Sequence, residues 1–252
     1  MINIGIIIQA RTGSTRLPNK MKLPFYQGES VLEILLQKLL ARYNAQQIVL
    51  ATTIADGDDS IEAIGKAANV NVFRGSEQDV LNRFIEAANK YGFSKIIRIC
   101  ADNPFLDIDS LWKLTEKFKT SNADYLAYAL SNGTPTIKTH YGFWAECVTL
   151  NALNRVQQAT REKVYHEHVT NYIYSHQDIF SCEFIPIPRE LEQNKKIRLT
   201  LDTQEDFDLQ KEIYSALAKQ NEFPKLEEII AYLEKHPSYY EIMKQQIINN
   251  SK

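Results

Sequence analysis

Short apolar runs alternate with amphipathic helical patterns through the first hundred residues of the chain. Four runs rich in β-branched residues predict strands, because each is too short for a helix and is flanked by loop residues. These runs cover 4–8, 47–51, 70–73 and 95–99. Helices are predicted between them, after the capping box of Ser30 and Glu33, over 61–68 and over 80–91. This β-α-β-α-β-α-β order predicts an α/β fold, a three-layer sandwich whose mostly parallel sheet carries helices on both faces.

The pattern is less regular after residue 100. The elements expected there are helices over 109–119, 151–158, 162–175, 225–235 and 239–248, strands over 123–128, 141–150, 180–186 and 197–202, and a helix that Thr203 and Asp206 cap. The segment 130–140 reads as a loop from its Ser, Asn, Gly and Pro content. No repeat or linker interrupts the chain, so we expect one domain over 1–252 with an excursion around 130–190.

Composition narrows the functional classes. Hydrophobic residues make up 44% of the 252 positions and charged residues 24%, which is typical of a globular protein. The formal charge of −2 gives no overall basic field, so we expect neither nucleic acid nor a membrane as a partner. Three widely spaced cysteines fit a reducing compartment, and the N-terminus lacks a signal-peptide pattern, so the expected location is cytoplasmic.

The loop that follows the first strand is rich in phosphate-binding chemistry. Arg11, Arg16 and Lys20 can neutralise phosphate charges, and Gly13 lets backbone N–H groups approach an anion. A Walker A loop needs Gly-Lys-Ser/Thr, and a dinucleotide fingerprint needs three glycines; neither pattern is present. Because ligands of open α/β sheets bind at the carboxyl ends of strands, we expect this loop to bind a polyphosphate.

Two aspartates follow predicted strands in the same way. Asp102 comes after the strand at 95–99, and Asp202 ends the strand expected over 197–202. If both strands are parallel to the first, both carboxylates reach the crevice beside the basic loop. Such a pair suits Mg²⁺, which binds one or two carboxylates together with substrate phosphates. The alternative is that each aspartate caps a helix, and this alternative is stronger for Asp202.

Several segments together resemble a known family, the cytidylyltransferases that make CMP-activated acidic sugars (acylneuraminate type), and most closely their spore coat polysaccharide F branch. The resembling segments are Gln9–Lys20, 51–53, 74–83, 98–104, 167–170 and 199–206. The resemblance implies a nucleotide-diphospho-sugar transferase fold, with CTP and a sugar acid as substrates and Mg²⁺ as cofactor. By the same analogy, a homodimer would form through the region after Leu130.

The resemblance also implies roles for individual residues. Those assigned to the nucleotide are Gln9, Ala10, Arg11, Gly13, Ser14, Arg16, Lys20, Thr52, Thr53, Arg74, Gly75, Ser76 and Cys100. Arg11, Lys20 and Asp102 would be catalytic, and Asp102 and Asp202 would hold Mg²⁺. Trp144, Glu146 and His168 would bind the acceptor. The His166–His168 pair is not expected to bind a metal, because positions i and i+2 of a helix do not share a face.

The chain departs from the family pattern at two positions. Ala101 replaces a usual glycine, and Trp144 stands where the branch has an aspartate. An indole cannot ligate a metal, although it can stack on a sugar face. Three functions therefore stay open: transfer of CMP to a sugar acid, transfer to a phosphorylated acceptor giving a CDP-linked product, and a non-catalytic binding protein. The cations considered for an acceptor phosphate are Lys138, Arg155, Arg161 and Lys163.

Overall fold

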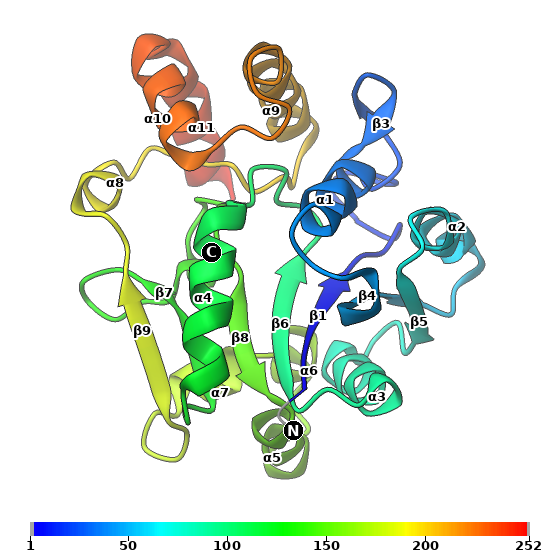
Figure 1. The fold of residues 1–252 in the computed structure, drawn as a ribbon. Helices are drawn as coiled ribbons and strands as arrows, with labels where there is room; N and C mark the ends of the chain where they lie inside the picture. Colours follow the sequence, from blue (N-terminus) through cyan, green and yellow to red (C-terminus); the bar gives the residue numbers. More distant parts are fainter. Residues whose placement is uncertain (1–2, 251–252) are drawn as a thin grey trace.

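The computed structural model describes residues 3–250 and is built around a seven-stranded sheet in the order β5-β4-β1-β6-β8-β7-β9 (Figure 1). Its strands are β1 (Ile4–Gln9), β4 (Ile48–Thr53), β5 (Asn71–Gly75), β6 (Lys95–Cys100), β7 (Tyr125–Ala129), β8 (Glu146–Thr149) and β9 (Cys182–Pro186). Only β8 runs against its neighbours in this sheet, so the predicted mostly parallel sheet is confirmed. A small hairpin that the sequence pattern did not reveal, β2 (Pro24–Tyr26) and β3 (Glu29–Ser30), precedes the first helix.

Helices cover both faces of the sheet (Figure 1). They are α1 (Val31–Leu40), α2 (Asp59–Ala67), α3 (Val80–Tyr91), α4 (Ile108–Thr120), α5 (Leu150–Ala159), α6 (Lys163–Glu167), α7 (Asn171–Ser175), α8 (Arg189–Gln193), α9 (Gln204–Leu217), α10 (Leu226–Lys235) and α11 (Ser238–Asn249). Three short 3₁₀ turns, η1 (Ala45–Gln47), η2 (Asp56–Asp58) and η3 (Thr136–Lys138), complete the described elements. The three-layer α/β architecture is therefore confirmed.

Strand β1 supplies both halves of the core. Ile6 and Ile8 pack into the cluster that includes α1, α4 and α9–α11, whereas Ile7 packs into the opposite cluster with α3 and α5. All three side chains are at most 1% exposed. Alternate residues of a strand point to opposite faces, so a continuous apolar run is what a strand covered on both sides requires.

The predicted helix caps are present. Ser30 and Glu33 form a capping box at α1, and Thr203 and Asp206 form another at α9. Asp79 accepts a hydrogen bond from the Asn82 amide at the start of α3. Each cap satisfies backbone N–H groups that have no partner inside the helix, and so fixes where the helix begins.

The segment 197–202 is not a strand, and the prediction of one was wrong. Its backbone amides do not form the hydrogen-bond ladder of a β-sheet. The amides of Leu199 and Thr200 both donate to the His140 carbonyl, and the Leu201 amide donates to the Asp102 carbonyl (3.0 Å). The apolar residues of this segment are buried, so the sequence looked like a strand. The bond from Leu201 nevertheless brings Asp202 to the end of β6.

Two further boundaries differ from expectation. Only the last part of 141–150 is a strand, because Gly142 has φ +73° and passes so close to Leu199 that an added Cβ would lie 2.4 Å from its carbonyl oxygen. The helix expected over 162–175 is divided into α6 and α7. At the break, Thr170 turns inward and its hydroxyl donates to buried Glu146 (2.8 Å).

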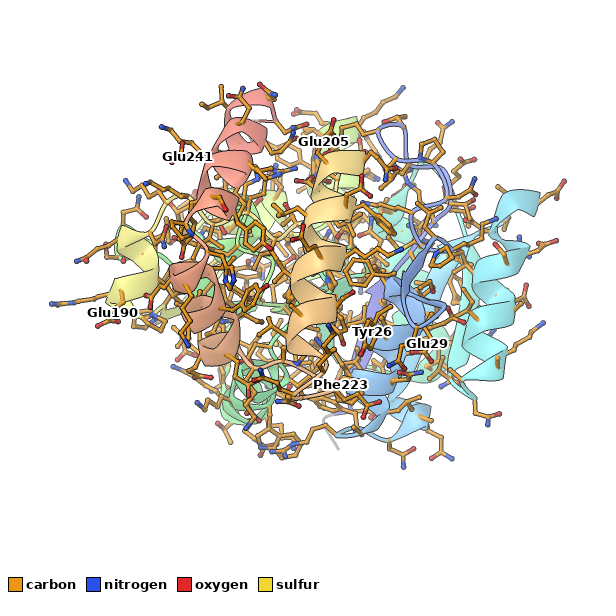
Figure 2. The ribbon with its side chains drawn as sticks, turned by 90° about the horizontal axis from the view of Figure 1, so that it is seen from above. Tyr26, Glu29, Glu190, Glu205, Phe223 and Glu241 are labelled. Carbon is orange, nitrogen blue, oxygen red and sulfur yellow. The ribbon has the colours of Figure 1, made fainter. Side chains whose placement is uncertain are left out.

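The C-terminal helices lie across one end of the molecule. Figure 2 shows α10 and α11 following one another along one side of α9, with Glu205 at the start of α9 and Glu241 on α11. Their apolar residues join the core cluster of α1 and α4. Within residues 3–250, no helix has the length and apolar character needed to cross a membrane.

Candidate functional site

The loop after β1 is fixed to the neighbouring strand by Asp58. The Thr12 amide and hydroxyl both donate to Asp58 Oδ1 at 2.7 Å, while the hydroxyls of Thr52 and Thr53 donate to Oδ2 at 2.9 and 2.6 Å. Burial alone would raise the pKa of Asp58, but the hydrogen bonds from Thr53, Thr12 and Thr52 lower it to about 2. Asp58 is therefore an ionised brace that joins the loop to the end of β4.

Asp58 was missed by the sequence analysis. The signal available was an acidic residue a few positions beyond a strand rich in threonine. Thr52 and Thr53, assigned to the nucleotide by resemblance, are at most 1% exposed and use their hydroxyls on this carboxylate.

Lys20 joins the loop to the end of β6. Its ammonium lies 2.8 Å from Asp102 Oδ2 and 2.7 Å from the Leu201 carbonyl oxygen, and the residue is only 8% exposed. The long side chain thus reaches between two segments that are 82 and 181 positions away in sequence. The structure therefore brings two of the predicted catalytic residues, Lys20 and Asp102, into direct contact.

Arg16 makes an equivalent contact with the second aspartate. Its guanidinium lies 2.9 Å from Asp202 Oδ1 and 3.2 Å from Asn250 Oδ1. Asp202 Oδ2 is bound by Arg198 (3.1 Å), a fully buried residue that also pairs with Asp206 (2.7 Å). Burial acts to lower the pKa of Arg198, but the hydrogen bond and charge of Asp206 outweigh it and raise the pKa.

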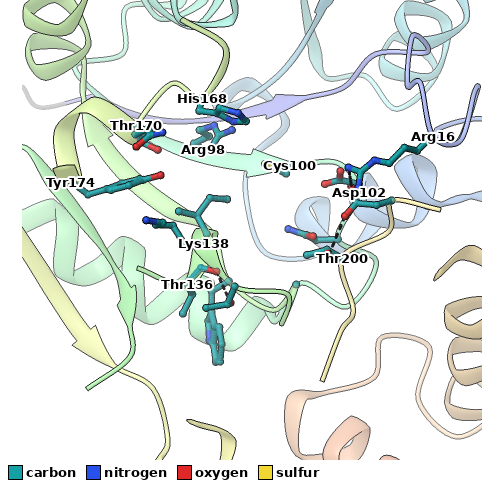
Figure 3. Close-up of a pocket in the computed structure, with 17 residues that line it drawn as sticks. Arg16, Arg98, Cys100, Asp102, Thr136, Lys138, His168, Thr170, Tyr174 and Thr200 are labelled. Atoms are coloured by element: carbon teal, nitrogen blue, oxygen red, sulfur yellow. Dashed lines mark hydrogen bonds and ion pairs between the residues drawn. The ribbon is translucent and has the colours of Figure 1, made fainter. Parts of the chain in front are cut away.

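Arg16 and both aspartates, Asp102 and Asp202, border a cavity of about 420 Å³ (Figure 3). Figure 3 shows Arg16, Asp102 and Thr200 at one end and Tyr174 and Thr170 at the other. The lining also includes Cys100, Asn103, Lys138, Trp144, His168 and Asp202. One cavity therefore contains residues predicted for phosphate, metal and acceptor binding.

The predicted acceptor residues are placed differently from one another. His168 is exposed and lines the cavity, whereas Trp144 is 6% exposed and packs against the rings of Tyr128, Tyr141 and Phe143. Glu146 is 2% exposed, and its carboxylate is bound by Arg98, Tyr125 and Thr170. Glu146 thus holds the buried wall of the cavity, and its contact with an acceptor stays a prediction.

Other predicted nucleotide residues surround the loop. Gln9 accepts a hydrogen bond from Arg98 (3.1 Å), Ala10 is buried, and the Ser14 hydroxyl accepts from the Leu17 amide (3.4 Å). Arg74 is turned away from the cavity, toward the carbonyls of Thr53 and Ala55 and the carboxylates of Asp59 and Glu62. Gly75 is buried at the end of β5, and the next residue, Ser76, caps the turn before α3 by accepting from the Asp79 amide (3.0 Å).

A second cavity of about 560 Å³ adjoins the loop at Arg11. It is lined by Arg11, Glu77, Gln78, Asp79, Val80, Arg161, Lys163, His166 and Glu167. Arg11 lies 4.0 Å from Glu167, and an added Cβ on Gly13 would lie 3.8 Å from Glu77. His166 binds Asp79 (2.8 Å) and the Thr160 carbonyl (3.1 Å), so it is occupied by structural partners and does not face the same cavity as His168.

The donor set at the first cavity suits Mg²⁺. Asp102 and Asp202 supply carboxylate oxygens, the ligands that this hard cation prefers, and substrate phosphates can complete its coordination. Among residues 3–250 there is no group of three or more His, Cys, Asp and Glu arranged to hold a metal by themselves. The site therefore fits a metal that arrives with a phosphorylated ligand.

The fold and the two cavities define a nucleotidyltransferase of the nucleotide-diphospho-sugar type. The cytidylyltransferase from Leptospira borgpetersenii serovar Hardjo-bovis superposes on the chain with a TM-score of 0.84 at 29% identity, covering 97% of this chain and 98% of that one. A sequence model of the cytidylyltransferase family matches residues 5–245. The chain belongs to the cytidylyltransferase family.

Curated relatives agree with this assignment. The spore coat polysaccharide biosynthesis protein SpsF of Bacillus subtilis is 34% identical over 94% of this chain and 96% of its own length. An uncharacterized protein of Methanocaldococcus jannaschii is 38% identical over 92% and 90%. The 3-deoxy-manno-octulosonate cytidylyltransferase of Francisella tularensis subsp. novicida is 32% identical over 44% of each chain. The resemblance stated from the sequence is confirmed, and the chain is a CTP-dependent nucleotidyltransferase.

Proposed function

We propose that this enzyme transfers CMP from CTP to a sugar acid, with Mg²⁺, and releases pyrophosphate. The observation that carries the proposal is the first cavity, where Arg16, Asp102 and Asp202 share one space with Trp144 and His168. Transfer between two ligands requires both in one enclosed site, with the reacting atoms close together. The activity of the Francisella tularensis relative supports a sugar acid as the acceptor.

In the reaction an acceptor hydroxyl oxygen forms a bond to the α-phosphorus of CTP, the bond from that phosphorus to pyrophosphate breaks, and the hydroxyl proton is released. The chain's task is to position the two ligands and to stabilise negative charge on the departing pyrophosphate. Arg16 and Lys20, now paired with Asp202 and Asp102, would stabilise that charge. Asp102 and Asp202 would hold Mg²⁺, which when bound supplies a Lewis acid.

The contacts of the cations near the acceptor site indicate how well that site could bind a phosphorylated acceptor. Of the four considered from the sequence, Lys138 lines the first cavity, Arg155 binds Asp124 (3.0 Å), and Arg161 and Lys163 line the second cavity. One exposed lysine is a small charge complement for a phosphate monoester, whereas it can pair with a single carboxylate. A sugar acid is therefore the preferred acceptor.

Thermal unfolding with Mg²⁺ and each of CTP, UTP, ATP and GTP tests the nucleotide half of the proposal. A ligand at about 100 times its dissociation constant adds roughly 2.7 kcal/mol of stability, so a large rise in the midpoint is expected with CTP and Mg²⁺ together. Pyrophosphate release with 3-deoxy-manno-octulosonate and other sugar acids then tests the acceptor. A midpoint that no nucleotide moves would refute the proposal. The homodimer and the cytoplasmic location stay predictions. Analytical ultracentrifugation would test the homodimer.

A further inference from the structure

Arg83 on α3 is a buried cation without a carboxylate partner. It is 0% exposed, and none of the ion pairs within residues 3–250 includes it. Its Nη1 donates to the Ser76 carbonyl (2.7 Å), and its stem packs under Gly75, where an added Cβ would lie 3.1 Å from Arg83 Cγ. Burial, followed by the charge of Arg11, lowers the pKa of Arg83 to about 10, which still leaves it charged at neutral pH.

Two nitrogens of this guanidinium, Nε and Nη2, have no hydrogen-bond partner among the described residues. These two nitrogens form one edge of the planar group, and their N–H bonds are parallel. Such an edge matches two adjacent acceptor atoms of a ligand. Leaving both donors buried and unpaired is costly, so a ligand that satisfies them is the simplest reason to keep an arginine here.

The position of Arg83 indicates which part of a nucleotide it would meet. Its partner Ser76 directly precedes Glu77, Gln78 and Asp79, which line the second cavity beside Arg11. The rim of that cavity mixes carboxylates with cations, which is unfavourable for a triphosphate. Arg16 and Lys20, with the two predicted metal ligands, lie at the first cavity or next to it. The phosphates therefore belong there, and the base belongs toward Arg83.

We propose that Arg83 recognises the base of CTP, its Nε and Nη2 donating to the adjacent acceptors O2 and N3 of cytosine; this inference rests on the proposed function. Uracil carries a hydrogen on N3, so it offers this edge one acceptor and one clashing donor. The same contact that binds cytosine thus discriminates against UTP. Arg83 lines neither cavity in this structure, so the base reaches its buried guanidinium edge when the side chains over that edge move aside.

Calorimetric titration with CTP, UTP and 3-deaza-CTP, each with Mg²⁺, tests the inference. 3-Deaza-CTP lacks only the N3 acceptor, so it probes the contact in the unaltered protein. The test variant is Arg83→Lys, which keeps the charge and loses the two-donor edge. Its matched control is Arg155→Lys, because Arg155 uses its guanidinium on Asp124 and the Ile179 carbonyl, outside both cavities.

The unaltered protein should bind CTP about tenfold or more tightly than UTP or 3-deaza-CTP. Arg83→Lys should lower the affinity for CTP to that for UTP and leave the affinity for UTP unchanged. Arg155→Lys should bind all three nucleotides with the affinities of the unaltered protein. Equal weakening of CTP and UTP would instead assign Arg83 to the triphosphate and overturn the inference, as would equal binding of CTP and 3-deaza-CTP. The 3-deaza-CTP comparison decides the matter even if Arg83→Lys does not fold. If the unaltered protein binds no nucleotide, the proposed function itself fails.

Discussion

Lys20 and Asp102 form an ion pair of 2.8 Å that joins the loop after β1 to the turn after β6. Arg16 and Asp202 form a second pair of 2.9 Å nearby. In both pairs a residue predicted to bind phosphate neutralises one predicted to bind Mg²⁺. The cations and carboxylates of the site are thus held in place by each other, and bound nucleotide and metal would replace these contacts with stronger ones.

Substituting Asp102→Asn should abolish the part of CTP binding that depends on Mg²⁺, because an amide is a much poorer ligand for this cation than a carboxylate. Turnover should fall on the order of a hundredfold or more, as for other losses of a group that stabilises transition-state charge. The measurement is the rise in unfolding midpoint caused by CTP, with and without Mg²⁺. Asp109→Asn is the control, since Asp109 is 56% exposed and pairs weakly with Lys225 at 3.7 Å. A full Mg²⁺ effect in Asp102→Asn would exclude this residue as a ligand.

Substituting Asp58→Asn should loosen the loop and raise KM for CTP. The folded carboxyl has a pKa of about 2, below its value in the unfolded chain, so its contribution to stability is present above about pH 4. That contribution, roughly 2 kcal/mol, is lost as the pH falls from about 4 to 2. Urea unfolding of both proteins at pH 7 should show the difference, and acid titration should show it shrinking. Asp56→Asn, in the same turn, serves as the comparison. If it changed KM for CTP and the stability as much as Asp58→Asn does, the hydrogen bonds of Asp58 would have no special role.

The sequence predicted the sheet, and that the loop after β1 lies at its carboxyl edge, because both depend on local patterns. Ile6 to Ile8 had to be a strand covered on both faces, and parallel strands had to bring Gln9 and Cys100 to one edge. The contacts of Asp202 and Glu146 could not be predicted, since they arise from segments far apart in sequence. Asp202 reaches the site through an irregular segment, and Glu146 is bound by partners 21, 24 and 48 positions away.

Substituting Glu146→Gln should destabilise the protein by about 3–5 kcal/mol, because it leaves Arg98 buried without its counter-charge. The double variant Arg98→Met/Glu146→Leu should be less destabilised than Glu146→Gln alone, since neither charge then remains buried. Urea unfolding measures both. Glu183→Gln, which breaks the half-exposed pair with Lys117 (2.7 Å), should cost less than about 1 kcal/mol. Similar costs for Glu146→Gln and Glu183→Gln would contradict the argument from burial.

Lys38 should make stability rise with pH in the alkaline range. It is 2% exposed, and its ammonium donates to the Pro104 carbonyl (2.8 Å), at the turn that carries Asp102. Burial lowers the pKa of Lys38 from 10.5 to about 7, and the nearby Asp107 offsets this only in part. Between about pH 7 and 10.5 the unfolded chain therefore binds more protons than the folded protein, so the free energy of unfolding increases with pH.

Lys38 alone should make the free energy of unfolding rise by up to about 1.4 kcal/mol per pH unit in that range. Below about pH 6 it should contribute no slope, because Lys38 is protonated in both the folded and the unfolded state. Urea unfolding of the natural protein and Lys38→Met at pH 7.5, 8.5 and 9.5 measures it. Other groups titrate in both proteins, so the difference between the two isolates Lys38. Lys66→Met, on exposed Lys66, should keep the natural slope. If the curves for Lys38→Met and the natural protein run parallel, the buried lysine does not titrate as its surroundings require.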